Sequence, residues 1–204
     1  MNHKDHWDNI YKDKSPLEVS WYQRKPAISL ALIRKLAQDK ADYIIDVGGG
    51  ASTLSDFLLE DGFNHITVLD LSSNALDHAR QRLGDKSVLI EWKVEDVTNF
   101  VPGCSYDIWH DRAVFHFLTA KEERVKYKQV LESSVKAGGH VIIAAFAIGG
   151  PTKCSGLDIV QYDAVKLKDE LGKNFTFIEE IYEKHITPTD KEQKFSYFVF
   201  TKNA

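Results

Sequence analysis

The stretch Tyr43-Ile44-Ile45-Asp46-Val47-Gly48-Gly49-Gly50-Ala51-Ser52 decides the fold. Its short apolar run is typical of a buried strand, and the glycine turn Gly48–Gly50 directly after it predicts a sharp turn into a helix. In open α/β sheets such a turn lies at the carboxyl ends of the strands, where ligands bind. The helix that follows would add free N–H groups and the positive end of its dipole. We therefore expect a ligand site at this turn, rather than a turn that is only structural.

On both sides of this stretch, strand-length apolar runs alternate with helix-like stretches. Further strands are expected at 66–70, 88–93, 106–110, 141–146, 175–181 and 195–201, and helices at 26–38, 52–61, 73–83, 113–118, 121–135 and 164–171. This alternation predicts βαβ units and a largely parallel sheet. The link between the last two strands, residues 182–194, has no room for a helix, so these strands are expected to form an antiparallel pair at one edge. The prediction is a doubly wound α/β fold with a seven-stranded, mostly parallel sheet and an antiparallel C-terminal strand.

The 204 residues are enough for one domain with a short appendage. We expect residues 26–204 to form the domain and residues 1–25 to form an N-terminal lid. The lid segment carries four large aromatic residues, Trp7, Tyr11, Trp21 and Tyr22. They are compatible with a helix that covers the sheet and, equally, with a flap over a ligand.

Composition and charge exclude several classes of protein. Hydrophobic residues make up 43% and charged residues 27% of the chain, which is typical of a globular protein. The formal net charge of −4 gives no reason to expect a nucleic-acid partner. No apolar run approaches the ~20 residues of a membrane helix, so no membrane association is expected. Two cysteines cannot make a disulfide framework, and the charged N-terminus does not resemble a signal peptide, so we expect a cytoplasmic protein.

Carboxylates follow the predicted strands and indicate the chemistry of the ligand. Asp46 lies two residues before Gly48, where it would repel a pyrophosphate but suit a cationic amino group. Thr53 occupies the third glycine position of the dinucleotide motif. Asp70 ends the second strand and suits the hydroxyl pair of a ribose. Asp96, after the third strand, fits either an adenine edge or a local cap.

The order of these motifs resembles the class I S-adenosylmethionine-dependent methyltransferases over about residues 40–204. The resemblance rests on Asp46-x-Gly48-x-Gly50, Asp70, Asp96-Val97, Tyr106-Asp107-Ile108 and Gly138-Gly139-His140. That family has a seven-stranded sheet with a reversed last strand, in agreement with the predicted C-terminal pair. Ser52 stands where many members have a third glycine, at a position that varies in the family.

The resemblance implies S-adenosyl-L-methionine as the cofactor and transfer of its methyl group as the activity. The cofactor-binding residues that it implies are Trp21, Asp46 for the amino group, Gly48, Gly49 and Gly50 under the methionine part, Asp70 for the ribose hydroxyls, Leu71, Asp96 and Val97 around the adenine ring, and His110 facing the sulfonium.

A polar cluster after the fourth strand is the candidate catalytic segment. Methyl transfer is an in-line displacement that needs positioning, and a hydroxyl, thiol or ammonium nucleophile also needs a base. His110 and His116 could supply the base. Asp111 could hold a substrate cation, and Arg112 could hold a carboxylate or pair with Asp111. The alternatives are a local ion pair for Asp111 and Arg112 and a buried helix position for His116.

The acceptor stays open between a small molecule and a protein side chain. Trp7-x-x-x-Tyr11, Glu18–Tyr22, Asp111-Arg112-Ala113 and Leu118-Thr119 give a weaker resemblance to the eukaryotic protein-lysine methyltransferase branch, whose usual Asp-Lys-Gly is replaced here. The alternatives to an enzyme of this kind are a non-catalytic S-adenosylmethionine-binding module and, less favoured, an NAD-dependent oxidoreductase. The histidine spacing predicts no metal site, and the roles of Cys154 and His185 are not predicted.

Overall fold

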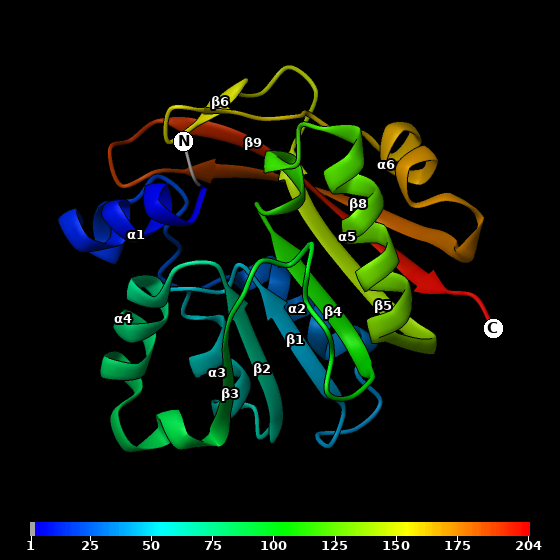
Figure 1. Ribbon diagram of the computed structural model, residues 1–204, viewed down its shortest axis with the longest axis horizontal. Helices are drawn as coiled ribbons and strands as arrows, with labels where there is room; N and C mark the ends of the chain where they lie inside the picture. The colour runs from blue at the N-terminus through cyan, green and yellow to red at the C-terminus, as the bar shows by residue number, and fades with distance from the viewer. Residues whose placement is uncertain (1–2) are drawn as a thin grey trace.

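A seven-stranded sheet forms the centre of the computed structural model, which describes residues 3–204 (Figure 1). The strands lie in the order β3 (Ile90–Val94), β2 (His65–Asp70), β1 (Tyr43–Val47), β4 (Tyr106–Arg112), β5 (Val135–Phe146), β9 (Glu192–Lys202) and β8 (Phe175–Ile186). Neighbours from β3 to β5 are parallel, whereas β9 runs antiparallel to both β5 and β8. The predicted sheet with its antiparallel C-terminal strand is confirmed.

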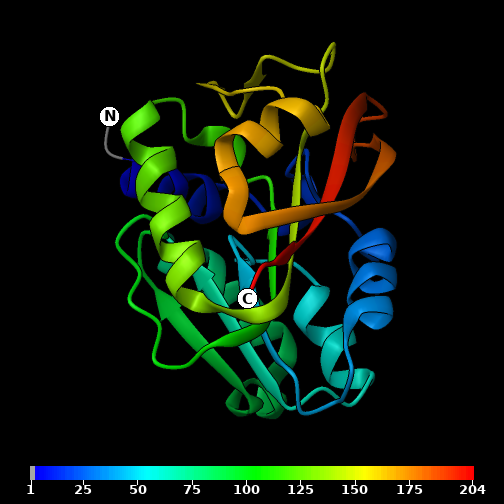
Figure 2. The ribbon, with the colours of Figure 1, turned by 90° about the vertical axis from the view of Figure 1, so that its right-hand side faces the viewer.

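Helices cover both faces of the sheet, as a parallel sheet requires. Because side chains alternate along a strand, Ile44 packs toward α2 (Ala27–Leu36) and α3 (Leu54–Glu60), whereas Ile45 packs toward α5 (Lys121–Ser134) and α6 (Ala164–Leu171). Figure 2 shows these layers on either side of the sheet. The crossover helix α4 (Ser73–Leu83) begins at Ser72, whose hydroxyl accepts a hydrogen bond from the Ala75 N–H.

The helix predicted at 113–118 is wrong, because only the 3₁₀ turn η3 (Phe115–Phe117) forms there. Ala113 adopts a left-handed φ of 74° and stops regular helix formation. The Asp111 carboxylate accepts hydrogen bonds from the N–H groups of Val114 and Phe115 and fixes the turn. A small hairpin that was not predicted, β6 (Lys153–Cys154) and β7 (Leu157–Asp158), follows β5.

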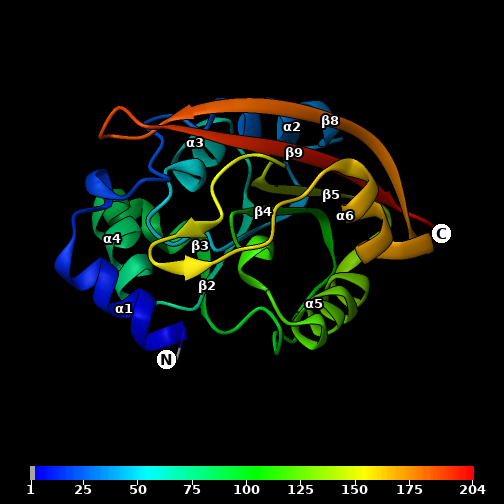
Figure 3. The same ribbon diagram turned by 90° about the horizontal axis from the view of Figure 1, so that it is seen from above.

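The N-terminal segment lies across the carboxyl ends of the strands. Its helix α1 (His3–Asp13) packs against α4, and η1 (Pro16–Glu18) follows (Figure 3). The Asp8 carboxylate accepts a hydrogen bond from the Ser72 hydroxyl at 2.6 Å, at the start of α4, where a negative charge is favourable. The Asn74 amide donates to the Asp8 carbonyl at 2.9 Å. Within residues 3–204 no helix has the length and apolarity to cross a membrane.

Candidate active site

The glycine turn and two carboxylates fit together at the carboxyl ends of β1 and β2. A Cβ atom added to Gly50 would lie 2.6 Å from Asp70 Oδ2, and one added to Gly49 would lie 2.5 Å from Asp46 Oδ2. Gly48 has a φ of +68°, and a side chain there would also collide with Val114. The glycines therefore do more than bend the chain, because they make room for Asp46 and Asp70 beside the turn.

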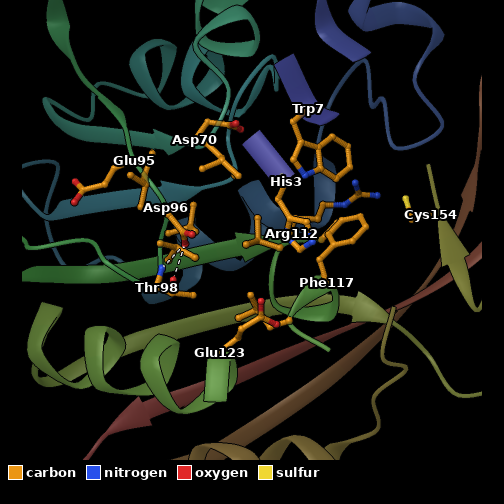
Figure 4. Close-up of a pocket in the computed structure, with 18 of the residues that line it drawn as sticks. His3, Trp7, Asp70, Glu95, Asp96, Thr98, Arg112, Phe117, Glu123 and Cys154 are labelled. Atoms are coloured by element: carbon orange, nitrogen blue, oxygen red, sulfur yellow. Dashed lines mark hydrogen bonds between the residues drawn. The ribbon is translucent and has the colours of Figure 1, made fainter. Parts of the chain in front are cut away.

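An outer cavity of about 940 Å³, including its open mouth, lies between α1, the ends of the strands and the segment after β4 (Figure 4). The apolar part of its wall suits a flat ring, and Asp70 lies at its edge. The Asp96 carboxylate is held by the Thr98 N–H and hydroxyl, both at 2.8 Å. The wall includes Trp7, Tyr11, Trp21, Gly48, Asp70, Leu71, Asp96, Val97, Arg112, Phe117 and Leu118.

The carboxyl group of Asp70 has an unusual electrostatic environment. It accepts a hydrogen bond from the Ser72 N–H at 2.8 Å, which favours the carboxylate. Burial opposes this effect and, together with the negative charges of Asp46 and Asp8, raises the pKa of Asp70 to about 7. The protein therefore keeps at this edge a group that changes charge near neutral pH.

An inner cavity of about 560 Å³ lies beneath the glycine turn and is walled on its other side by the strap, residues 19–23. Asp46 and His110 line it and form a buried chain with Ser29. His110 Nδ1 lies 2.7 Å from Asp46 Oδ1, and His110 Nε2 lies 2.9 Å from the Ser29 hydroxyl. Both ring nitrogens of His110 are thus engaged, and the ring holds the Asp46 carboxylate in place.

The two cavities share a wall made of Tyr11, Trp21, Gly48 and Arg112. The Trp21 indole N–H donates to the Tyr11 hydroxyl at 3.1 Å, so α1 and the strap are tied together at this wall. Trp7 packs edge-on against Trp21 and Phe117, with ring centroids 5.6 Å and 5.1 Å apart. Aromatic side chains from the N-terminal segment therefore close the junction of the cavities.

Arg112 is the member of the predicted catalytic cluster that lines both cavities. Its Nε donates to the Tyr197 hydroxyl at 2.9 Å, its Nη1 to the Trp21 carbonyl at 3.1 Å, and its Nη2 to Glu183 at 3.3 Å. The sequence offered Asp111 as its local partner, but the structure pairs it with Glu183 of β8. Asp111 instead accepts a hydrogen bond from the Tyr127 hydroxyl at 2.7 Å.

Asp111 and His116 are fully buried and line neither of the two cavities described within residues 3–204. Burial raises the pKa of Asp111 to about 6. The His116 ring stacks on Phe146, and burial together with the charge of Arg112 lowers its pKa to about 3. These placements support positioning roles for both residues rather than contact with an acceptor.

Sequence reasoning missed several wall residues, including Leu118 and Glu123, and it assigned no role to Cys154. Cys154 reaches the outer cavity on the β6–β7 hairpin, and burial raises the pKa of its thiol to about 11. The richness of 109–117 in aromatic residues was a signal for Phe117. Glu123 could not be distinguished from any other charged residue in the first turn of a helix.

The chain is similar to methyltransferases in both sequence and structure. Residues 45–141 match the family described as "Methyltransferase domain". The eEF1A lysine and N-terminal methyltransferase of Danio rerio is 23% identical over 168 residues, which are 81% of this chain and 22% of that protein. The malonyl-(acyl-carrier protein) O-methyltransferase 1 of Ilyobacter polytropus is 30% identical over 104 residues, which are 50% of this chain and 37% of that protein.

Similarity to solved structures extends over the whole fold. The N-methyltransferase NodS from Bradyrhizobium japonicum, solved in complex with S-adenosyl-L-homocysteine, has a TM-score of 0.74 at 15% identity, and the match covers 100% of both chains. The sheet order, the reversed last strand and the turn after β1 define a Rossmann-like methyltransferase fold. In its fold and in part of its sequence, the chain is thus similar to the class I S-adenosylmethionine-dependent methyltransferases. It spans well under half of the length of either curated relative.

Proposed function

We propose that this chain transfers the methyl group of S-adenosyl-L-methionine to a small molecule or to a protein side chain. The observation that carries the proposal is the pair of cavities that meet at the glycine turn, with Asp46 in one and Asp70 at the edge of the other. A ligand with an amino-acid end and a nucleoside end matches this pair in shape and in charge. The curated relatives, one a protein methyltransferase and one a methyltransferase of a carrier-bound acid, leave both acceptor classes open.

The residues of the outer cavity fit an adenosyl group. The Asp70 carboxylate, when ionised, has lone pairs left to accept two ribose hydroxyls in addition to the Ser72 N–H. Leu71 and Val97 supply apolar surface for a purine, and Asp96, held by Thr98, borders it. The cofactor, when bound, would supply a methyl carbon on a positively charged sulfur, which the lone pair of an acceptor can displace.

The inner cavity supports a role for Asp46 at the amino group of the cofactor. His110 and Ser29 hold the Asp46 carboxylate from behind, so it is positioned before the ligand arrives. Preorganisation of this kind reduces the entropy lost on binding. We therefore propose His110 as a positioning residue for Asp46, whereas the sequence offered it as a base.

The N-terminal segment is proposed to be a lid. Trp7 and Tyr11 lie over the outer cavity, and their contacts with Trp21 tie α1 to the strap. A closed lid would exclude water and complete the acceptor space beside Phe117. Free thiols at Cys104 and Cys154 support the expectation of a reducing, cytoplasmic compartment.

Calorimetric titration with S-adenosyl-L-homocysteine and with NAD tests the cofactor. We expect binding of the first and not the second, and the reverse result would refute the proposal in favour of an oxidoreductase. As a control, the surface variant Asp77→Asn on α4, where Asp77 pairs with Arg80, should bind S-adenosyl-L-homocysteine normally. A screen of metabolite and protein fractions with labelled S-adenosyl-L-methionine then tests transfer. Binding without transfer to any fraction would favour a non-catalytic binding module.

A further inference from the structure

Arg112 places a buried positive charge at the junction of the two cavities. It lines both of them, together with Gly48 and Trp21. A ligand with its nucleoside in the outer cavity and its amino-acid end in the inner cavity must have its central atom at this junction. In the proposed function that atom is the sulfonium sulfur, so two positive charges would meet there.

Glu183 is the carboxylate that opposes this charge. The Arg112 and Glu183 side chains are only 10% and 12% exposed, and their ion pair is 3.3 Å long. The Tyr197 hydroxyl donates to the same Glu183 oxygen at 3.1 Å, and the Gln23 amide donates to the other at 2.7 Å. Both carboxylate oxygens are thus satisfied, as a buried carboxylate requires.

The other carboxylates near the junction have different partners. Asp46 is bound by His110, Asp111 by Tyr127 and backbone N–H groups, and Asp70 by the Ser72 N–H. Glu183 therefore balances Arg112, while Arg112 stays free to hold the strap through the Trp21 carbonyl. The pair keeps an ordered wall beside the junction without leaving a net positive charge on it.

We propose that Glu183 is a specificity-determining residue that allows this site to accept a cationic cofactor. The inference rests on the proposed function. Methyl transfer turns the positive sulfonium into a neutral thioether, so the substrate and product cofactors differ by one charge at the junction. An Arg112 without its partner would repel S-adenosyl-L-methionine but not S-adenosyl-L-homocysteine.

The test compares the dissociation constants of the two cofactors by calorimetry in the full chain. Glu183→Gln should weaken binding of S-adenosyl-L-methionine about tenfold more than binding of S-adenosyl-L-homocysteine, as expected for one unit of charge nearby in a partly solvated site. The difference should shrink at high salt. A looser strap, or a lost contact to the carboxylate of the ligand, would weaken the binding of both cofactors equally. The ratio of the two dissociation constants therefore reports the effect of the charge alone.

Two further variants keep the test decisive. Glu179→Gln, on the same strand, removes a surface pair with Lys35 and should leave the ratio unchanged. The double variant Arg112→Met, Glu183→Gln removes both charges. Its ratio of dissociation constants for the two cofactors should therefore stay within about twofold of the wild-type ratio. This variant also decides the question if Glu183→Gln alone does not fold, because neutral replacement of a buried pair is often tolerated.

Three results would count against the inference or its basis. Equal weakening of both cofactors by Glu183→Gln would overturn it. The inference would also be overturned if the double variant favoured S-adenosyl-L-methionine over S-adenosyl-L-homocysteine more than about fivefold better than the wild type does. In that case Arg112 would be an unbalanced charge in the wild type. A wild-type chain that binds neither cofactor would instead overturn the proposed function itself.

Discussion

Replacing Asp70 with asparagine should stabilise the ligand-free protein at alkaline pH and weaken its binding of the cofactor. The amide has nearly the same shape as the carboxylate but carries no charge. Burial and the charges of Asp46 and Asp8 raise the pKa of Asp70 to about 7, so its ionised form is disfavoured in the fold. The unfolded chain has an ordinary pKa of about 3.9 for this group.

The sign of the pH dependence follows from these two values. Between about pH 4 and pH 7 the folded protein holds a proton on Asp70 that the unfolded chain has lost, so the wild type loses stability as the pH rises. About three pKa units correspond to about 4 kcal/mol, and water at the cavity mouth reduces this to about 2 kcal/mol. Asp70→Asn should therefore be about 2 kcal/mol more stable than the wild type at pH 8 and nearly equal to it at pH 4.

Cofactor binding should change in the opposite direction. The amide of the variant keeps one oxygen acceptor, so it loses about one charged hydrogen bond to a ribose hydroxyl, at about 1.5–3 kcal/mol, and we expect binding about tenfold to a hundredfold weaker. For the wild type, affinity for S-adenosyl-L-homocysteine should rise from pH 6 to pH 8, with release of a proton on binding. Urea unfolding at both pH values and calorimetry in two buffers measure these effects. Unchanged affinity, or lower stability of Asp70→Asn at pH 8, would refute the reasoning.

Other positions give further tests. Gly48→Val should lower the melting temperature and abolish cofactor binding, because the left-handed backbone and Val114 leave no space for a side chain; normal melting and binding would contradict this. Tyr11→Phe removes the acceptor of the Trp21 indole and should cost about 1 kcal/mol of cofactor binding, with a change in tryptophan fluorescence; an unchanged spectrum and affinity would argue against the tie. Tryptic cleavage within residues 3–25 should be slowed by S-adenosyl-L-homocysteine, and equal cleavage with and without it would count against the lid.

The sheet was predictable from sequence because each strand is a short apolar run with a turn signal at its end. The run Tyr43–Val47 and the glycines after it needed only local information. The expected helix at 113–118 failed because the left-handed Ala113 and the Asp111 carboxylate override the helical spacing of its apolar residues. The long-range pairing of Arg112 could not be predicted either, because nothing near it in the sequence indicates Glu183, 71 residues away, as its partner.

The site could be predicted only where its residues follow strand ends. Asp46 and Asp70 were predicted in this way, and the structure places both beside the glycine turn, where a Cβ at Gly49 or Gly50 would meet their oxygens. The aromatic residues of the N-terminal segment indicated a lid, but the sequence did not indicate where this segment docks. Its docking depends on Asp8 and Ser72, which the sequence does not distinguish from other surface residues.

The contacts between the strap and β8 can form only late in the synthesis and folding of this protein. Ser20 and Gln23 hydrogen-bond to His185 and Glu183, residues at least 160 positions further along the chain. A chain emerging from the ribosome can order the strands around the glycine turn long before β8 exists. The wall between the cavities is finished only when the final hairpin joins the sheet, because β9 must insert between β5 and β8. Competence to bind cofactor should therefore appear only after β8 and β9 have left the ribosome and joined the sheet.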